Sequence, residues 1–82
     1  MTKGEYRVGI NFNPSADDTV GRIKSMAAQL IDFIDGIEEH GEQLDMRFSE
    51  IKRLKALAQT EIESAAMWAV KAATKPAPEE AK

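Results

Sequence analysis

Residues 42–73 read EQLDMRFSEIKRLKALAQTEIESAAMWAVKAA, an uninterrupted segment without proline or glycine. Its apolar residues recur three or four positions apart, which predicts one long amphipathic helix. The apolar stripe consists of Leu44, Phe48, Ile51, Leu54, Ala58, Ile62, Ala65, Trp68 or Ala69, and Ala72. Further apolar residues lie beyond the stripe, at Met46, Leu57, Ala66, Met67 and Val70. One packed face cannot cover both sets, and we expect the Trp68 ring to be buried.

A second amphipathic helix is predicted upstream, between Ala16 and His40. Its apolar stripe consists of Val20, Ile23, Ala27, Leu30, Ile34 and Ile37. Ser15 is the predicted N-cap, with Asp18 completing a capping box, and Gly41 is the predicted stop. Because only a few residues connect the two helices, they must lie antiparallel as a hairpin.

Two shorter segments flank the hairpin. The expected boundaries are residues 1–15 for an N-terminal arm, 16–73 for the hairpin and 74–82 for a disordered tail. In the arm every second residue is apolar over a short run, which predicts an extended segment. These alternating residues are Tyr6, Val8, Ile10 and Phe12.

The size of the chain predicts that it assembles with copies of itself. It has 82 residues and no cysteine, so no disulfide can support it. A domain of this size buries only about 60% of the surface that its unfolded chain exposes, so its core is expected to be marginal. The surplus apolar residues of the second helix also need cover. The expected fold class is therefore all-α, an antiparallel two-helix hairpin completed by homo-oligomerisation.

Charge is divided unevenly along the chain, whose net charge is -3. Residues 32–50 hold seven acidic residues against Arg47 alone, a balance of -6, and residues 52–75 return +3. We therefore expect an acidic tip and a more basic open end. A mildly acidic chain is not expected to bind long nucleic acids. Without an apolar run for a membrane span or a signal peptide, the protein is expected in the cytoplasm and not in a membrane.

The sequence lacks the patterns of catalytic and metal sites. His40 is the only histidine, cysteine is absent, and no glycine-rich phosphate loop occurs. Asp32 with Asp35, and Glu38 with Glu42, have helical spacing, which we interpret as a solvated acidic face. We therefore expect no enzyme activity, no metal and no cofactor.

The open end of the predicted hairpin gathers groups that suit an anion. A turn at Gly41 would place Lys24 level with Ala58 and Arg22 level with Thr60, because facing residues would have numbers that sum to about 82. The polar and aromatic groups nearby would be Gln59, Thr60, Tyr6 and Phe12. Phosphate would suit the two cations, and a base could stack on an aromatic ring.

Each of these groups also has a simpler interpretation. Phe12 could pack the arm onto Trp68, and Lys24 could be a solvated surface cation. The Lys52-Arg53-Lys55 cluster is typical of the polar face of a helix. From the residues alone, the chain is an oligomeric helical hairpin of unknown partner.

Three segments carry a family resemblance: GINFNPS at residues 9–15, Val20 through Ile23-Lys24, and LAQTEIESAAMWAVKA at residues 57–72. They resemble the small helical-hairpin proteins with which bacteriophages counter the CBASS and Thoeris defences. The resemblance covers roughly residues 8–74, and its C-terminal segment is the more specific part. It implies a homohexamer that sequesters cyclic oligonucleotide second messengers without cleaving them.

The resemblance also implies where cyclic dinucleotides bind. Lys24 matches a lysine that meets phosphate when such a ligand is held between protomers. The aromatic residue that stacks on a base, ahead of the first helix, corresponds to Tyr6 or to Phe12. Asn13 adjoins Phe12 and completes this set of candidates.

A separate family pocket takes cyclic trinucleotides and uses an arginine beside a threonine on the second helix. Here Gln59 precedes Thr60 at that place, so the chain departs from the pattern. Arg53, about two turns earlier, is the candidate to replace the missing arginine.

An adaptor role is the alternative function. The surplus apolar residues of the second helix and the acidic tip could serve contacts with another protein. In that case the hairpin would be a structural module, and Lys24 would have no special part in it.

Overall fold

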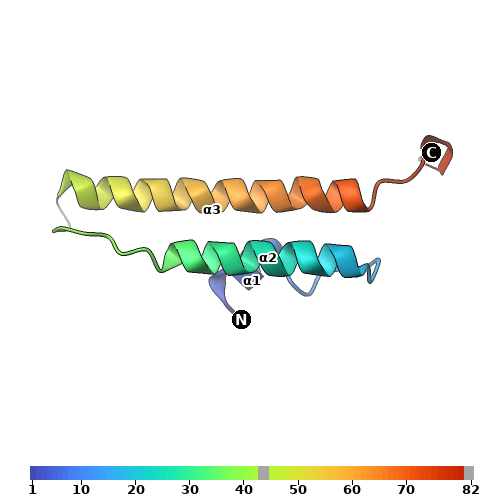
Figure 1. Ribbon diagram of the computed structural model, residues 1–82, viewed down its shortest axis with the longest axis horizontal. Helices are drawn as coiled ribbons and strands as arrows, with labels where there is room; N and C mark the ends of the chain where they lie inside the picture. Colours follow the sequence, from blue (N-terminus) through green and yellow to red (C-terminus); the bar gives the residue numbers. More distant parts are fainter. Residues whose placement is uncertain (43–44, 81–82) are drawn as a thin grey trace.

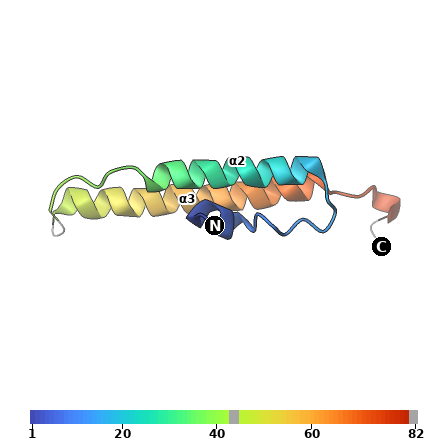
Figure 2. The same cartoon turned by 90° about the horizontal axis from the view of Figure 1, so that it is seen from below.

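The computed structural model describes residues 1–42 and 45–80, and within them the fold is built from α-helices. The elements are α1 (Lys3–Val8), α2 (Asp18–Asp35), α3 (Met46–Ala73) and a short 3-10 turn, η1 (Pro78–Glu80). α2 and α3 run antiparallel and side by side, and α1 packs on α2 and, less extensively, on α3 (Figure 1, Figure 2). The all-α prediction is confirmed. No helix in the described ranges is long and apolar enough to cross a membrane.

The N-terminal arm contains a helix, which corrects the prediction of an extended segment. The Thr2 hydroxyl accepts a hydrogen bond from the Glu5 amide (3.1 Å), and the Glu5 carboxylate accepts one from the Thr2 amide (2.8 Å). This capping box starts α1, and Gly9 ends it in a left-handed conformation with φ of 65°. The alternating apolar residues therefore span a helix and the loop after it.

Gly4 allows α1 to cross α2 at close range. A Cβ atom at this position would lie 2.1 Å from the backbone oxygen of Ala28. The Gly4 amide donates a hydrogen bond to the Asp32 carboxylate at 2.7 Å. Any side chain in place of Gly4 would therefore force the two helices apart.

The N-terminus of α2 lies two residues beyond the predicted cap. Asp17, not Ser15, is the N-cap, and its carboxylate accepts hydrogen bonds from the amides of Thr19 and Val20. Ala16 precedes it with a positive φ of 52°, so the chain is still turning where the helix was expected to begin.

The C-terminus of α2 is at Gly36, not at Gly41. Lys55 of α3 binds the end of the helix: its ammonium donates to the backbone oxygens of Asp35 (2.9 Å) and Ile37 (2.5 Å). The following segment is not helical and continues in the direction of α2 beside the first turns of α3 (Figure 1). A cation from the neighbouring helix therefore stabilises the C-terminus of α2.

This early stop changes the register of the hairpin. α2 has 18 residues and α3 has 28, and at about 1.5 Å per residue their lengths differ by about 15 Å. The connection after α2 spans that difference, so the facing residues Gln59 and Ile31, which are hydrogen-bonded at 3.0 Å, have numbers that sum to 90. The predicted sum of 82 is wrong, and Lys24 lies near Ala66 instead of Ala58.

The core between the helices is small. Its buried apolar residues are Val20, Ala28, Ile31 and Ala66, and the half-buried members of the predicted stripes include Ile23, Ala27, Ile34, Ile51, Ala58, Ile62 and Ala69. Leu30 is exposed, because α2 turns one face to α1 and another to α3, and Ile37 is exposed beyond the end of α2. Leu44 lies outside the described residues.

Much apolar surface is left uncovered on α2 and α3. The exposed large side chains there are Met26, Leu30, Phe33, Met46, Leu54, Leu57, Met67 and Trp68. Trp68 is 66% exposed, so the prediction of a buried ring is wrong for the single chain. The total accessible surface of 6281 Å² exceeds the roughly 4,900 Å² expected for a compact monomer of 9.1 kDa.

Candidate ligand-binding site

Lys24 is a buried cation near the start of α2, with only 8% of its surface exposed. Its ammonium donates to the backbone oxygen of Gly9 at 3.0 Å and also to that of Phe12. The ammonium lies 5.4 Å from the centre of the Phe12 ring. Among the residues that the structure describes, no carboxylate lies within 4.0 Å of it. Its direct partners among the described residues are therefore backbone dipoles and one aromatic ring.

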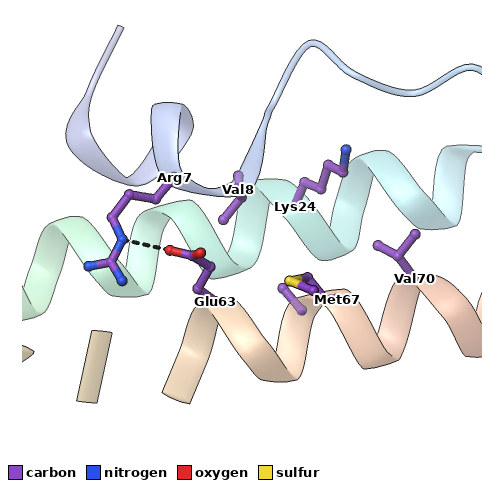
Figure 3. A pocket seen from close by; sticks show the side chains of 7 residues that line it. Arg7, Val8, Lys24, Glu63, Met67 and Val70 are labelled. Atoms are coloured by element: carbon purple, nitrogen blue, oxygen red, sulfur yellow. Dashed lines mark hydrogen bonds and ion pairs between the residues drawn. The ribbon is translucent and has the colours of Figure 1, made fainter. Parts of the chain in front are cut away.

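A cavity of about 200 Å³ adjoins this lysine. It is lined by Arg7, Val8, Lys24, Glu63, Ala66, Met67 and Val70. Figure 3 shows Arg7 and Glu63 reaching toward each other from α1 and α3, while the ammonium of Lys24 points away from Met67. Ligand pockets usually measure about 300–1,000 Å³, so this cavity can hold only part of a nucleotide ligand.

The two candidate aromatic residues share a second, shallower hollow on the α1 side of the molecule. Tyr6 and Phe12 both line it, and they are 78% and 72% exposed. Phe12 therefore does not anchor the arm on Trp68, which corrects one of the interpretations of this residue. Both rings are open to a stacking partner, and the Phe12 ring is the one beside a cation.

Asn13 organises the turn that leads into α2. Its amide nitrogen donates to the backbone oxygen of Asp17 at 3.0 Å, and its side-chain oxygen accepts from the Ser15 hydroxyl at 3.1 Å. Asn13 also lines a hollow that includes Phe12 and Lys24. It thus lies beside the candidate site with its side chain already engaged.

Gln59 is 2% exposed and belongs to the packing of the helices, not to an open site. Its amide nitrogen donates to the backbone oxygen of Ile31 (3.0 Å) and to Asp35 (3.2 Å), and its oxygen accepts from Lys3 (3.1 Å). The hydrogen bond from Lys3, followed by that from Gln59, holds the pKa of Asp35 below its ordinary value of 3.8. This network fastens α1 to the hairpin.

Thr60 has a guanidinium beside it, but not the predicted one. Arg53 forms a bidentate pair with Glu50, both contacts at 2.8 Å, and remains on the exposed face of α3. The Thr60 hydroxyl instead accepts a weak hydrogen bond from Arg7 at 3.4 Å. Arg7 is held by Glu63 at 2.7 Å. Within the single chain Arg7, and not Arg53, is therefore the arginine beside Thr60, and a ligand-binding role of Arg53 stays a prediction.

The shifted register divides the predicted site into two places. Lys24, Phe12 and Asn13 lie together near Val70, whereas Gln59 is committed to the network with Lys3 and Asp35. Sequence reasoning missed Arg7 and Glu63, because no local spacing relates residues 56 positions apart. Within the described ranges, no three acidic or histidine side chains gather as a metal site.

The fold and the site define a small helical-hairpin domain in which an N-terminal helix and its loop cover a buried cation. The family model "Acb2/Tad1, hairpin domain" matches residues 4–74, and the chain therefore belongs to that family of anti-CBASS and anti-Thoeris sponges. The family consists of binding proteins of the sponge type. Comparisons with curated proteins and with solved structures gave no match.

Proposed function

We propose that this protein is an anti-defence sponge of the host-cell cytoplasm. It binds cyclic oligonucleotide second messengers, cyclic dinucleotides first, holds them intact and so keeps CBASS-type immune effectors inactive. The observation that carries the proposal is the buried ammonium of Lys24, which has no carboxylate partner among the described residues and lies beside an exposed aromatic ring. Family membership supplies the class of ligand.

Each part of a cyclic dinucleotide has a candidate partner. A phosphate would receive a charge-assisted hydrogen bond from Lys24. A base would stack on Phe12, whose ring is 5.4 Å from the ammonium, or on Tyr6 across the same hollow. Asn13 would border the ligand from the turn before α2.

For cyclic trinucleotides we propose Arg7 as the phosphate-binding group. It reaches the Thr60 hydroxyl from α1, although Gln59 occupies the place of the arginine expected on α3. Its partner Glu63 lowers the positive charge available there. Glu63→Gln should therefore strengthen binding of cyclic trinucleotides if this pocket is used.

We further propose that the working form is a homo-oligomer, a hexamer as the resemblance implies. The accessible surface exceeds that of a compact monomer by about 1,400 Å². The exposed large apolar side chains on α2 and α3 form part of this surface, and other chains would cover them in an assembly. Assembly of several chains would also complete a site whose cavity is too small for a whole ligand.

Native mass spectrometry tests the assembly. The wild-type protein should appear as a hexamer, and Trp68→Ala should shift it to smaller species. If the ring is buried between chains, its loss should weaken the assembly by about 3–5 kcal/mol. Circular dichroism should show the same helix content, because Trp68 is exposed in the single chain. A monomeric wild-type protein would contradict the proposal.

Calorimetry with a panel of cyclic dinucleotides and cyclic trinucleotides tests the main proposal. A bound ligand should be recovered intact after heat denaturation of the protein, as capture without cleavage requires. Absence of binding across the panel would overturn the sponge function, and release of linear product without denaturation would overturn the capture mechanism.

A structural adaptor remains the second candidate, favoured by the exposed Met46, Leu54 and Leu57 close to the acidic tip. Capture of a stoichiometric protein partner that survives Lys24→Met but is lost on reversal of the tip charges would support it. Retention of that partner after charge reversal would count against it.

A further inference from the structure

The partners of Lys24 all come from one short loop. Gly9 and Phe12, the first and last residues of that loop, supply the two backbone oxygens that accept from the ammonium, and the ring of Phe12 lies over it. We infer that residues 9–12, here called the strap, occupy Lys24 in the ligand-free protein and that an anionic ligand must displace them. The inference rests on the proposed function and adds how the same site is regulated.

The strap has a defined conformation of its own. The Gly9 and Ile10 amides donate to the backbone oxygens of Tyr6 (3.2 Å) and Glu5 (3.0 Å), and the Phe12 amide donates to the Gly9 oxygen at 2.9 Å. The Gly9 oxygen therefore accepts both from the strap itself and from Lys24. The backbone of Gly9 has φ of 65°, so this closed arrangement favours glycine.

Phosphate has an electrostatic advantage over the strap. The strap offers neutral carbonyl oxygens to a buried cation, whereas a phosphate oxygen carries a negative charge. Among the described residues, no carboxylate within 4.0 Å of Lys24 supplies such a charge. The Phe12 ring is 72% exposed and lies 5.4 Å from the ammonium, so a base can stack on it while a phosphate takes the place of the Phe12 oxygen. One displacement thus completes the site.

Closure of the strap lowers the apparent affinity for ligand. A ligand that binds only the open form has its apparent affinity reduced by the fraction of molecules that are open. Weakening the strap should therefore tighten binding, although it removes a favourable contact of the free protein. This direction is opposite to that expected if residues 9–12 were only a rigid part of the binding surface.

Gly9→Ala weakens the strap through its backbone alone. A Cβ atom at Gly9 would lie 3.8 Å from the Phe12 Cβ and 4.0 Å from the Lys24 ammonium, so it fits sterically. The left-handed conformation, however, is unfavourable for alanine. Gly41→Ala is the control, because Gly41 also has a positive φ (100°) and lies in the connection between α2 and α3, where its Cβ atom would meet Asp45 and not Lys24.

Calorimetry with a cyclic dinucleotide that the wild-type protein binds gives the first readout. Gly9→Ala should bind about fivefold tighter or more, and Gly41→Ala should bind as the wild type does. Unchanged or weaker binding by a Gly9→Ala variant with native helix content would overturn the strap. Absence of binding by the wild-type protein would instead overturn the proposed function.

Hydrogen exchange without ligand gives the second readout. The amide of Phe12, which bonds to the Gly9 oxygen, should exchange about tenfold faster in Lys24→Met than in the wild type. Lys52→Met is the control, because the Lys52 ammonium also lies over an aromatic ring, Phe48, at 5.7 Å but is exposed. Equal exchange in the two variants would overturn the strap independently of any ligand.

Discussion

Two lysines are held in nearly the same way in different parts of the molecule. Lys24 and Lys55 each donate to two backbone oxygens at or after the C-terminal end of a helix, α1 in the first case and α2 in the second. The two lysines differ in their counter-charge. The Lys55 ammonium lies 3.3 Å from the Glu39 carboxylate, whereas Lys24 has no carboxylate partner among the described residues.

This difference separates a structural cation from a candidate functional one. Lys55 sits at the negative end of α2 and has a counter-charge, so its role is complete within the chain. Lys24 is just as enclosed, yet its charge is balanced only by dipoles and a ring. Burial alone therefore does not identify a ligand-binding lysine, and the missing counter-charge is the more informative observation.

The largest expected effect is a loss of stability at the attachment of α1, which carries the loop that binds Lys24. Gly4→Ala should lower the free energy of unfolding by about 3 kcal/mol, because its Cβ atom would lie 2.1 Å from the backbone oxygen of Ala28 and detach α1 with its loop. Urea denaturation measures this. Gly21→Ala is the control: its Cβ atom would have no heavy atom nearer than 3.9 Å, and it should be neutral or stabilising. Equal effects would show that α1 is not held at Gly4.

Ligand binding should distinguish the two lysines directly. Lys24→Met should weaken cyclic dinucleotide binding by about 1.5–3 kcal/mol through loss of a charge-assisted phosphate contact. Lys55→Met should leave the affinity unchanged, since Glu39 and the end of α2 already use that ammonium. Calorimetry on both variants decides, and equal losses would remove the distinction.

Stability gives a separate test of the structural role of Lys55. Lys55→Met should lower the free energy of unfolding by about 1–2 kcal/mol, because the backbone oxygens of Asp35 and Ile37 lose their shared donor. Loss of the Glu39 pair should add little, because such partly exposed pairs are weak. Thermal melting monitored by circular dichroism gives the value. An unaltered melting curve would mean that Lys55 does not hold the end of α2.

The smallest expected effect concerns pH at the attachment of α1. Hydrogen bonds from Lys3 and Gln59 lower the pKa of Asp35, so its contribution is present above the ordinary value of 3.8 and is lost as the pH falls through the lowered value. Asp35→Asn should remove this part of the acid dependence. The stabilities of the two proteins should therefore approach each other as the pH falls from 3.8 through the lowered pKa of Asp35 in acid titrations. A constant difference at all pH values would contradict this role.

The sequence predicted the elements of the hairpin better than their alignment. Helical spacing and the absence of proline or glycine were sufficient to predict α3 and the all-α fold class. The end of α2 depends on Lys55, a residue 20 positions away whose role has no local signal. The predicted register depended on where α2 ends, so Gln59 and Thr60 could not be placed correctly against Lys24.

A local signal for α1 was present in the sequence. Thr2 and Glu5 have the spacing of a capping box, and Gly9 follows at a suitable distance for a helix end. Apolar alternation over the same residues indicated a strand instead. The contact between Arg7 and Glu63, by contrast, arises only from packing of α1 on α3 and could not have been predicted.

The connection between α2 and α3 has a consequence for how this chain can change. It joins helices of unequal length, and Lys55 binds only its first residues, whereas Gln59, Ile31 and the attachment of α1 align the helices nearer Lys24. Residues can therefore be gained or lost at the tip while Lys24 keeps its neighbours. The tip is the place where this small protein can diversify, or accept an inserted reporter sequence, at least cost to ligand capture.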